Sequence, residues 1–276
     1  MRIDAHQHFW RYDPVEYAWT GGAESPISKH FMPEDLVPHM KEHGIDGTVA
    51  VQARDSLQEN DLLLGLAEAH DWILGVVGWV DLCASDVRAQ LERYAPHPKF
   101  KGVRHMVQSE PDDAFMLRED FGRGIALLEE FGLTYDILIF PRHLPYATEL
   151  AKRYPNQKFV LDHIAKPDIK NGTLEPWRTD FRELAKLDNV WCKVSGMVTE
   201  AAWGSWRPEH FEPYLETAFE AFGEKRIMFG SDWPVCKLSA EYDRTIGLVE
   251  NHIGSWSPDA RNRIMGENCA AFYGLK

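Results

Sequence analysis

Short runs of β-branched and aromatic residues alternate along this chain with longer stretches of helical spacing, and no other feature constrains the fold as much. The starts of the runs recur at intervals of about 25 to 45 residues, the length of one strand-plus-helix unit. Eight such units predict a parallel sheet closed into a (β/α)8 TIM barrel. The predicted strands are Arg2–His6, Gly47–Gln52, Ile73–Asp81, Gly102–Met106, Thr134–Phe140, Lys158–His163, Val190–Ser195 and Arg226–Ser231.

Amphipathic segments fill the intervals between the predicted strands, and glycine follows directly after four of them, as expected for a helix end. Pro38 within the first segment predicts a delayed start or a kink. A last segment, Pro258–Phe272, is expected to close the bottom of the barrel. The other predicted helices are Glu34–His43, Glu59–His70, Asp86–Tyr94, Phe121–Phe131, Leu144–Tyr154, Asp180–Leu187, Pro208–Phe222 and Tyr242–Ile253.

The 276 residues contain no linker rich in Gly, Ser or Pro, no repeat and no low-complexity tract. Single α/β barrels commonly reach this length, so we expect one domain that covers residues 1–276. The composition, 44% hydrophobic and 26% charged, is that of an ordinary globular protein.

Bulk properties exclude several classes of partner. A formal net charge of −13 opposes binding to nucleic acid, which requires a clustered basic surface. The longest apolar run, Trp72–Val80, is too short to span a bilayer, and the N-terminus lacks the pattern of a signal peptide, so we expect a cytoplasmic protein. The four cysteines show no CxxC spacing, which argues against disulfides and against a thiolate zinc site. The expected partner is a small molecule; the oligomeric state is not indicated.

Polar residues stand at the carboxyl ends of all the predicted strands except the fifth. In a (β/α)8 barrel the active groups come from these strand ends and the loops after them, so the pattern predicts a functional rim. The residues are His6, His8, Gln52, Asp81, Arg104, His105, His163, Lys193, Ser195 and Asp232.

His6 and His8 are two residues apart at the end of the first strand. Side chains alternate along a strand, so both imidazoles face the same side and can approach one point. Imidazole suits zinc and related divalent metals, and Asp232 from the last strand would complete an open site with room for water. His6, His8 and Asp232 are therefore the predicted ligands of one metal ion.

Four motifs carry a resemblance to a known family. They are Asp4–Trp10 (DAHQHFW), Lys101–His105 (KGVRH), Leu161–Pro167 (LDHIAKP) and Gly230–Pro234 (GSDWP). Their occurrence in this order resembles the amidohydrolase-related branch of the amidohydrolase superfamily, and within it the sugar-lactone hydrolases typified by L-fuconolactonase. The resemblance extends over essentially the whole chain, and it implies hydrolysis of a small sugar lactone to the aldonic acid.

The chain departs from the superfamily pattern in one respect. Members with two metals carry a lysine or glutamate at the end of strand 4 and usually a histidine at the end of strand 5. Here strand 4 ends in Arg104 and His105, and strand 5 ends in Ile139–Pro141, which argues against a binuclear site. His6, His8 and Asp232, with or without His163, suit one metal. Some relatives of this branch work without any, so the sequence is compatible with metal-independent catalysis.

Lactone hydrolysis requires an activated water, a polarised carbonyl and a proton for the leaving ring oxygen. Asp232 is the predicted base, which later returns the proton; the alternative is a structural Asp that caps a turn. His163 is expected to polarise the carbonyl, and His105 is a second catalytic candidate. Asp162, the neighbour of His163, is expected to face the helices and is left out of the site.

Four further residues are candidates for substrate binding. Arg104 would hold substrate oxygens with its planar fork of donors, but alternation lets only one of Arg104 and His105 face the barrel mouth, and the sequence does not say which. Gln52 is placed to bind a sugar hydroxyl. Trp10 and Trp233 are expected to line a carbohydrate pocket, as are Trp203 and Trp206, because aromatic faces pack against the CH faces of sugars.

Two other functions compete with the lactonase. A metal-dependent non-oxidative decarboxylase would need an aromatic pocket and a firm metal site, and the absent strand 5 histidine counts against it. A catalytically inactive binding protein is the remaining alternative, and the presence of Asp232 with both strand 1 histidines counts against it.

Overall fold

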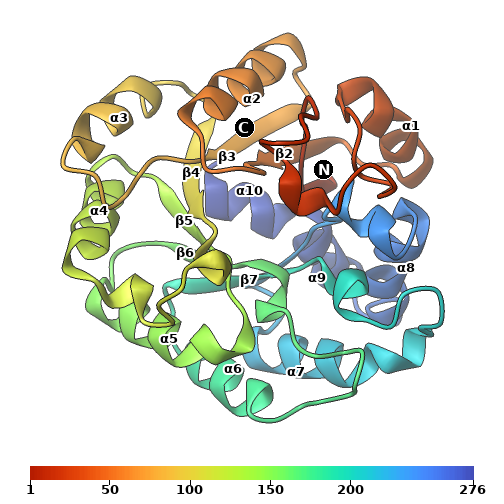
Figure 1. Cartoon of the computed structure of the whole chain (residues 1–276). Coiled ribbons are helices and arrows are strands. Elements are labelled where there is room, and N and C mark those ends of the chain that lie inside the picture. Colours follow the sequence, from red (N-terminus) through yellow and green to blue (C-terminus); the bar gives the residue numbers. More distant parts are fainter.

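The computed structural model describes all residues 1–276. Eight parallel strands in the order β1 to β8 form a nearly closed barrel with the helices outside it (Figure 1), which confirms the predicted (β/α)8 fold. None of the helices combines the length with the apolar character that a membrane span requires. The strands are β1 Ile3–Gln7, β2 Gly47–Val51, β3 Ile73–Gly78, β4 Phe100–His105, β5 Thr134–Ile137, β6 Phe159–Leu161, β7 Val190–Val194 and β8 Ile227–Phe229.

The helices follow the predicted segments with shifted ends. α1 continues through Pro38. α7 starts only at Glu212, because Pro208–His210 forms a separate 3-10 turn. The last predicted helix is interrupted by a π-helical turn over Arg263–Glu267. The helices are α1 Pro33–His43, α2 Leu57–Ala69, α3 Val87–Tyr94, α4 Glu119–Glu130, α5 Leu144–Arg153, α6 Trp177–Ala185, α7 Glu212–Phe222, α8 Tyr242–His252, α9 Pro258–Asn262 and α10 Asn268–Tyr273.

The barrel closes beyond the end of β8 rather than along it. The amide of Asp232 donates to the carbonyl of His6 at 2.8 Å, and the amide of His8 donates to the carbonyl of Trp233 at 2.7 Å. The buried carboxylate of Asp4 accepts from the amide of Ser231 at 2.8 Å, which fastens the first strand to the segment after the last. Burial raises the pKa of Asp4 to about 6 despite these hydrogen bonds. This seam brings the strand 1 histidines next to Asp232.

Two hydrophobic cores hold the barrel. The larger, of 70 buried residues, includes side chains from both the strands and the helices that surround them. The smaller, of 10 residues, combines strand residues such as Ala5 and Val77 with Cys269, Phe272 and Tyr273 of α10. α10 lies behind the strands in Figure 1 and plugs the barrel, as predicted for the last helical segment.

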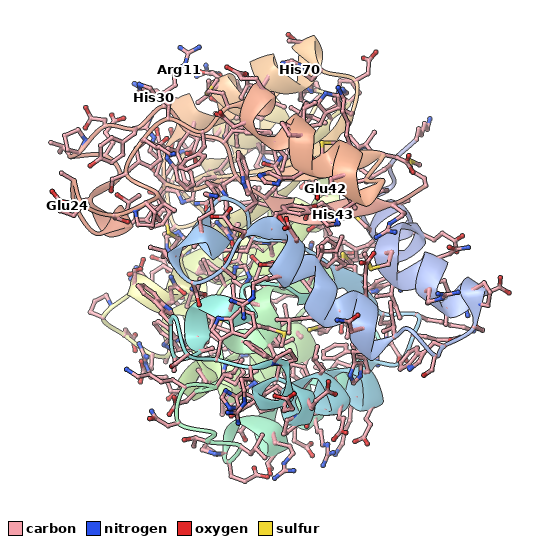
Figure 2. The ribbon with its side chains drawn as sticks, turned by 90° about the vertical axis from the view of Figure 1, so that its right-hand side faces the viewer. Arg11, Glu24, His30, Glu42, His43 and His70 are labelled. Carbon is pink, nitrogen blue, oxygen red and sulfur yellow. The ribbon has the colours of Figure 1, made fainter.

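Several strands are shorter than predicted: β3 ends at Gly78, β6 at Leu161 and β8 at Phe229. Polar residues expected on strands therefore lie in the loops that follow. The longest of these loops joins β1 to α1, and Figure 2 shows its residues Arg11, Glu24 and His30 on the left side of the molecule, with His43 of α1 farther to the right. The carboxyl-end loops form the wall of the candidate site.

Candidate active site

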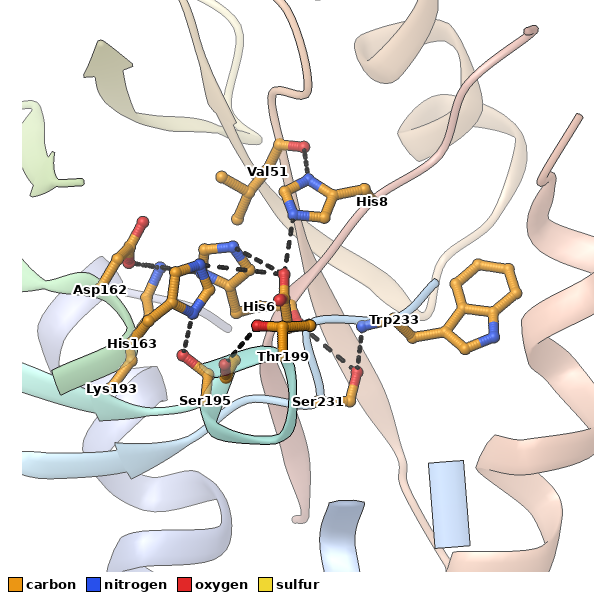
Figure 3. A network of polar contacts seen from close by, with 12 residues as sticks. His6, His8, Val51, Asp162, His163, Lys193, Ser195, Thr199, Ser231 and Trp233 are labelled. Atoms are coloured by element: carbon orange, nitrogen blue, oxygen red, sulfur yellow. Dashed lines mark hydrogen bonds and ion pairs between the residues drawn. The ribbon is translucent and has the colours of Figure 1, made fainter. Parts of the chain in front are cut away.

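Three histidines surround one carboxylate oxygen at the mouth of the barrel. Asp232 Oδ1 lies 3.2 Å from Nε2 of His8, 3.8 Å from Nε2 of His6 and 3.9 Å from Nε2 of His163. Dashed lines from these three histidines converge in Figure 3. All four side chains are buried. Asp232 has a φ of 57°, in the left-handed region that non-glycine residues seldom adopt. The structure thus brings the two predicted strand 1 histidines, His163 and Asp232 to one point.

The orientation of His8 indicates where a cation would sit. Its Nδ1 lies 2.7 Å from the carbonyl oxygen of Val51, which can only accept, so Nδ1 carries the hydrogen. Nε2 then presents a lone pair to the carboxylate of Asp232 at 3.2 Å. Two acceptors face each other there, and a proton or a metal ion between them would satisfy both.

His6 has a donor beside each ring nitrogen. Its Nε2 lies 3.1 Å from Nη1 of Arg104 and its Nδ1 lies 3.2 Å from Nζ of Lys193, while Oδ1 of Asp162 is 3.3 Å from the same Nδ1. His6, His8 and Asp232 place their ligand atoms within 4.8 Å of one another, and the donor set of two imidazoles and a carboxylate suits one divalent ion. Binding through His6 requires that its hydrogen bond with Arg104 is given up.

A buried network of four charges lies beneath the histidines. Lys193 Nζ lies 3.1 Å from Oδ1 of Asp162 and also pairs with Asp136, and Nη1 of Arg104 lies 3.1 Å from Oδ2 of Asp162. Tyr273 of α10 donates to Asp136 at 2.7 Å. Two cations balance two carboxylates, so buried charge is compensated and Asp162 stays ionised, its pKa held low by Lys193 and His6 against the effect of burial.

The prediction that Asp162 faces the helices is wrong. It assumed that β6 continues through His163, whereas the strand ends at Leu161 and the alternation ends with it. Four consecutive residues then adopt left-handed backbone, with φ of 54° at His163, 46° at Ile164, 60° at Ala165 and 51° at Lys166. Each such residue costs about 1 kcal/mol or more. This strained turn directs Asp162 and His163 to the same end of the barrel.

His163 is held by the two residues that directly follow β7. Its Nδ1 lies 2.8 Å from the hydroxyl of Ser195. The next residue, Gly196, has a φ of 60°, and a Cβ built there would lie 2.4 Å from Nδ1 of His163. Only glycine gives both this backbone conformation and this space.

The electrostatics favour a carboxylate among neutral imidazoles. Burial lowers the pKa of His6, His8 and His163, so all three are neutral near pH 7. Burial acts in the opposite direction on Asp232, but interactions with His163, with His8 and with the ammonium of Lys166 outweigh it and lower the pKa of Asp232 below its ordinary value of 3.8. Asp232 is therefore ionised and able to accept a proton.

A cavity of about 330 Å³ lies above Asp232. Arg104, His8 and His163 contribute to its wall from the barrel, and the surrounding loops add Trp19 and Trp203, which are 44% and 55% exposed. A larger depression of about 1010 Å³ adjoins it and shares the loop residues Lys166, Thr199, Glu200 and Trp203. The site is open on the side of these loops.

The strand 4 pair divides as alternation requires. Arg104 faces the barrel interior, where it contacts His6 and lines the cavity. His105 points outward: its ring stacks on Phe115 with centroids 5.1 Å apart, and its Nε2 lies 2.7 Å from Oε1 of Glu110. The structure does not bring His105 to the cavity, which corrects its expected place at the reaction centre.

Three other predicted substrate contacts lie behind the wall. Trp10 is fully buried and donates to the carbonyl of Lys29, and Trp233 packs against Phe31 in the core, which corrects their expected place in the pocket. Gln52 accepts from Nε and Nη2 of Arg104 at 2.9 and 2.7 Å and so orients that guanidinium.

Sequence reasoning missed Trp19, Lys166 and Glu200 as lining residues. Lys166 stands within the LDHIAKP motif, so its place beside His163 was a signal that could have identified it. Trp203, expected near the pocket, does line it, whereas Trp206 is buried and donates to Ser239 at 2.9 Å.

The barrel carries two histidines at the end of its first strand and an aspartate after its last, and comparison with known proteins identifies the family of enzymes to which it belongs. Residues 3–275 match the family described as Amidohydrolase, and the chain belongs to this family. The L-fucono-1,5-lactonase of Burkholderia multivorans is 40% identical over 286 residues, which cover 100% of this chain and 96% of that protein.

Solved structures show the same likeness. An amidohydrolase from Burkholderia multivorans with bound zinc superposes with a TM-score of 0.96 at 40% identity and covers 100% of both chains. A 2,6-dihydroxybenzoate decarboxylase reaches a TM-score of 0.71 at 14% identity over 99% of both chains, which shows that it shares the fold.

Proposed function

We propose that this protein hydrolyses a small sugar lactone, L-fucono-1,5-lactone or a related aldonolactone, to the aldonic acid. The observation that carries the proposal is an ionised Asp232 at the floor of a cavity, encircled by three neutral histidines. The L-fucono-1,5-lactonase of Burkholderia multivorans is 40% identical to this chain over its whole length, and this likeness supports the same reaction. The decarboxylase alternative has less support, because β5 is followed by Leu138 and Ile139 rather than by a histidine.

Asp232 would act as the base. It accepts a proton from water, whose oxygen forms a bond with the lactone carbonyl carbon. When that carbon releases the ring oxygen, Asp232 returns the proton to it, which leaves a hydroxyl group and a carboxylic acid. The carboxylate therefore ends the cycle ionised, as it began.

His163 and Arg104 would stabilise the carbonyl oxygen as it gains negative charge. If the Ser195 hydroxyl donates to Nδ1 of His163, Nε2 carries the hydrogen and faces the cavity as a donor. Arg104 adds permanent positive charge, and Gln52 holds its orientation. Trp19 and Trp203, the exposed aromatic residues of the wall, offer flat surfaces for the CH face of a sugar ring.

His6, His8 and Asp232 are also the proposed ligands of one divalent metal, with zinc suited to their chemistry. When bound, such an ion supplies a Lewis acid that polarises a carbonyl and lowers the pKa of water. Without it, His6 and His8 serve to position Asp232 and the substrate.

The test is acid release from a panel of five- and six-membered sugar lactones, followed with a pH indicator. We expect turnover by the wild type and a loss of about a thousandfold in Asp232→Asn, since a positioned base contributes about 10² to 10⁴. Asp243→Asn, an exposed carboxylate on α8, is the matched control and should keep full activity.

Chelator treatment followed by zinc addition forms the second arm of this experiment. Loss and recovery of activity would support the metal site, whereas unchanged turnover of metal-free protein would limit His6 and His8 to positioning. Folded wild type that opens no lactone of the panel would refute the lactonase proposal.

A further inference from the structure

Lys166 and Glu200 carry opposite charges on the wall of the cavity, yet neither is engaged in an ion pair. The side chain of Lys166 has the ring of Phe140 at 5.7 Å from Nζ, and no carboxylate pairs with it. Glu200 has one side-chain partner, the hydroxyl of Thr199 at 3.4 Å. Both residues are half-buried, and neither takes part in the reaction described above.

Unpaired charges in such a place are unfavourable unless something binds to them. Removing an ammonium or a carboxylate from water costs free energy that a partner must offset. Burial lowers the pKa of Lys166 and raises that of Glu200, and the attraction between the two charges offsets each shift only in part. On the outer surface the same chain pairs comparable groups, such as Lys237 with Glu241 and Lys186 with Glu183.

The backbone conformation of the turn holds Lys166 in a defined position. Lys166 ends the left-handed turn that starts at His163, with a φ of 51°, and its amide donates to the carbonyl of His163 at 2.8 Å. The same left-handed turn therefore positions both His163 and Lys166 on the wall of the cavity. Thr199, the neighbour of Glu200, lines the same cavity as His8 and His163.

We propose that Lys166 and Glu200 recognise the hydroxyl groups of the substrate ring and so select polyhydroxylated lactones. A hydroxyl can accept from the ammonium of one residue and donate to the carboxylate of the other, which a bare lactone ring cannot do. Trp203, which shares this wall, would hold the apolar face of the same ring. This inference rests on the proposed lactonase function, and the ring hydroxyl groups are the feature of the substrate that Lys166 and Glu200 would recognise.

The pair should treat neutral and anionic ligands differently. A neutral ring uses both residues as hydrogen-bond partners, so loss of either weakens binding. The aldonate product carries a carboxylate, which Lys166 attracts and Glu200 repels. Loss of the two charges should therefore change aldonate binding in opposite directions, a result that general damage to the site would not produce.

The experiment measures binding by calorimetry, with a sugar lactam as the uncharged, hydrolysis-resistant probe and the aldonate as the anionic probe. We expect Lys166→Met and Glu200→Gln each to weaken lactam binding about tenfold or more, because hydrogen bonds to charged groups are strong. For the aldonate, Lys166→Met should weaken binding about tenfold and Glu200→Gln should tighten it. Lys166→Arg, which keeps the charge, should retain aldonate binding.

Lys170→Met is the matched control, because this exposed lysine lies on the same loop but outside the cavity above Asp232, and it should change neither affinity. Equal effects of both variants on both probes, no effect on either, or a wild type that binds no lactam would each overturn the proposal. Wild type that binds the lactam but opens no lactone would refute the lactonase activity and leave hydroxyl recognition standing.

Discussion

Gly196 has no side chain, yet it determines how His163 faces Asp232. Its φ of 60° and the 2.4 Å that would separate a Cβ from Nδ1 of His163 leave room for glycine alone. Gly230 has a similar role beside β1, since a Cβ there would lie 2.6 Å from Cβ of His6. Single residues thus act on the site in two ways. Some supply the reactive side chains, and glycines leave the space in which those side chains pack.

Gly196→Ala should push the imidazole of His163 away and reduce kcat/KM about a hundredfold, because a displacement of about 1 Å at a catalytic group can have this effect. The matched control is Gly204→Ala, which has a φ of 73° but no atom within 4 Å of the new Cβ. Both variants should lose about 1 kcal/mol of stability in urea unfolding through the backbone alone. Equal activity of the two variants would contradict this role of Gly196.

At the scale of elements, the first turn of α2 ties two active-face loops together. Glu59 is buried and its Oε2 accepts from the amides of Ala53 and Arg54 at 2.8 and 3.0 Å. Its Oε1 accepts from the hydroxyl of Tyr17 at 3.1 Å, in the loop that carries Trp19. Burial raises the pKa of Glu59 to about 7, although these hydrogen bonds lower it in part.

The raised pKa of Glu59 predicts that the stability of the fold depends on pH. Folding favours protonated Glu59, so its contribution to the unfolding free energy is full below its ordinary pKa of 4.5 and is lost as the pH rises through about 7. The wild type should lose about 3 kcal/mol relative to Glu59→Gln between pH 4.5 and pH 8, as measured by urea unfolding at several pH values. A difference between the two proteins that stays constant with pH would contradict the assignment.

At the scale of the whole molecule, one end of the barrel carries the candidate site and the other end is closed by apolar packing. The polar groups of the candidate site gather at the carboxyl ends of the strands, whereas α10 fills the opposite end with Cys269, Phe272 and Tyr273. The charge network links the two ends, because Tyr273 donates to Asp136, which pairs with Lys193 beneath His6. Stability and function therefore depend on different side chains of one continuous interior.

Phe272→Ala should remove about 3 to 5 kcal/mol from the unfolding free energy, because it opens a cavity in a tightly packed core. Activity per folded molecule should stay within about twofold, as the cavity lies at the end away from Asp232. Urea unfolding and kcat/KM measured below the transition test both statements. Val15→Ala, at an exposed residue, should leave both unchanged, and a loss of kcat/KM in Phe272→Ala at full folding would show that the two ends are coupled.

The sequence by itself determined the barrel and the order of its strands, because the periodicities of strands and helices are local properties. It also determined that His6, His8, His163 and Asp232 meet, because the carboxyl ends of parallel strands lie at the same end of a barrel. Only the tertiary structure decided which neighbours face the cavity. Alternation predicts a side only while a strand continues, and β6 ends one residue before Asp162. Trp10 and Trp19 stand in one loop, yet the loop folds back so that Trp10 pairs with Phe31 and is buried, whereas Trp19 is left on the cavity wall.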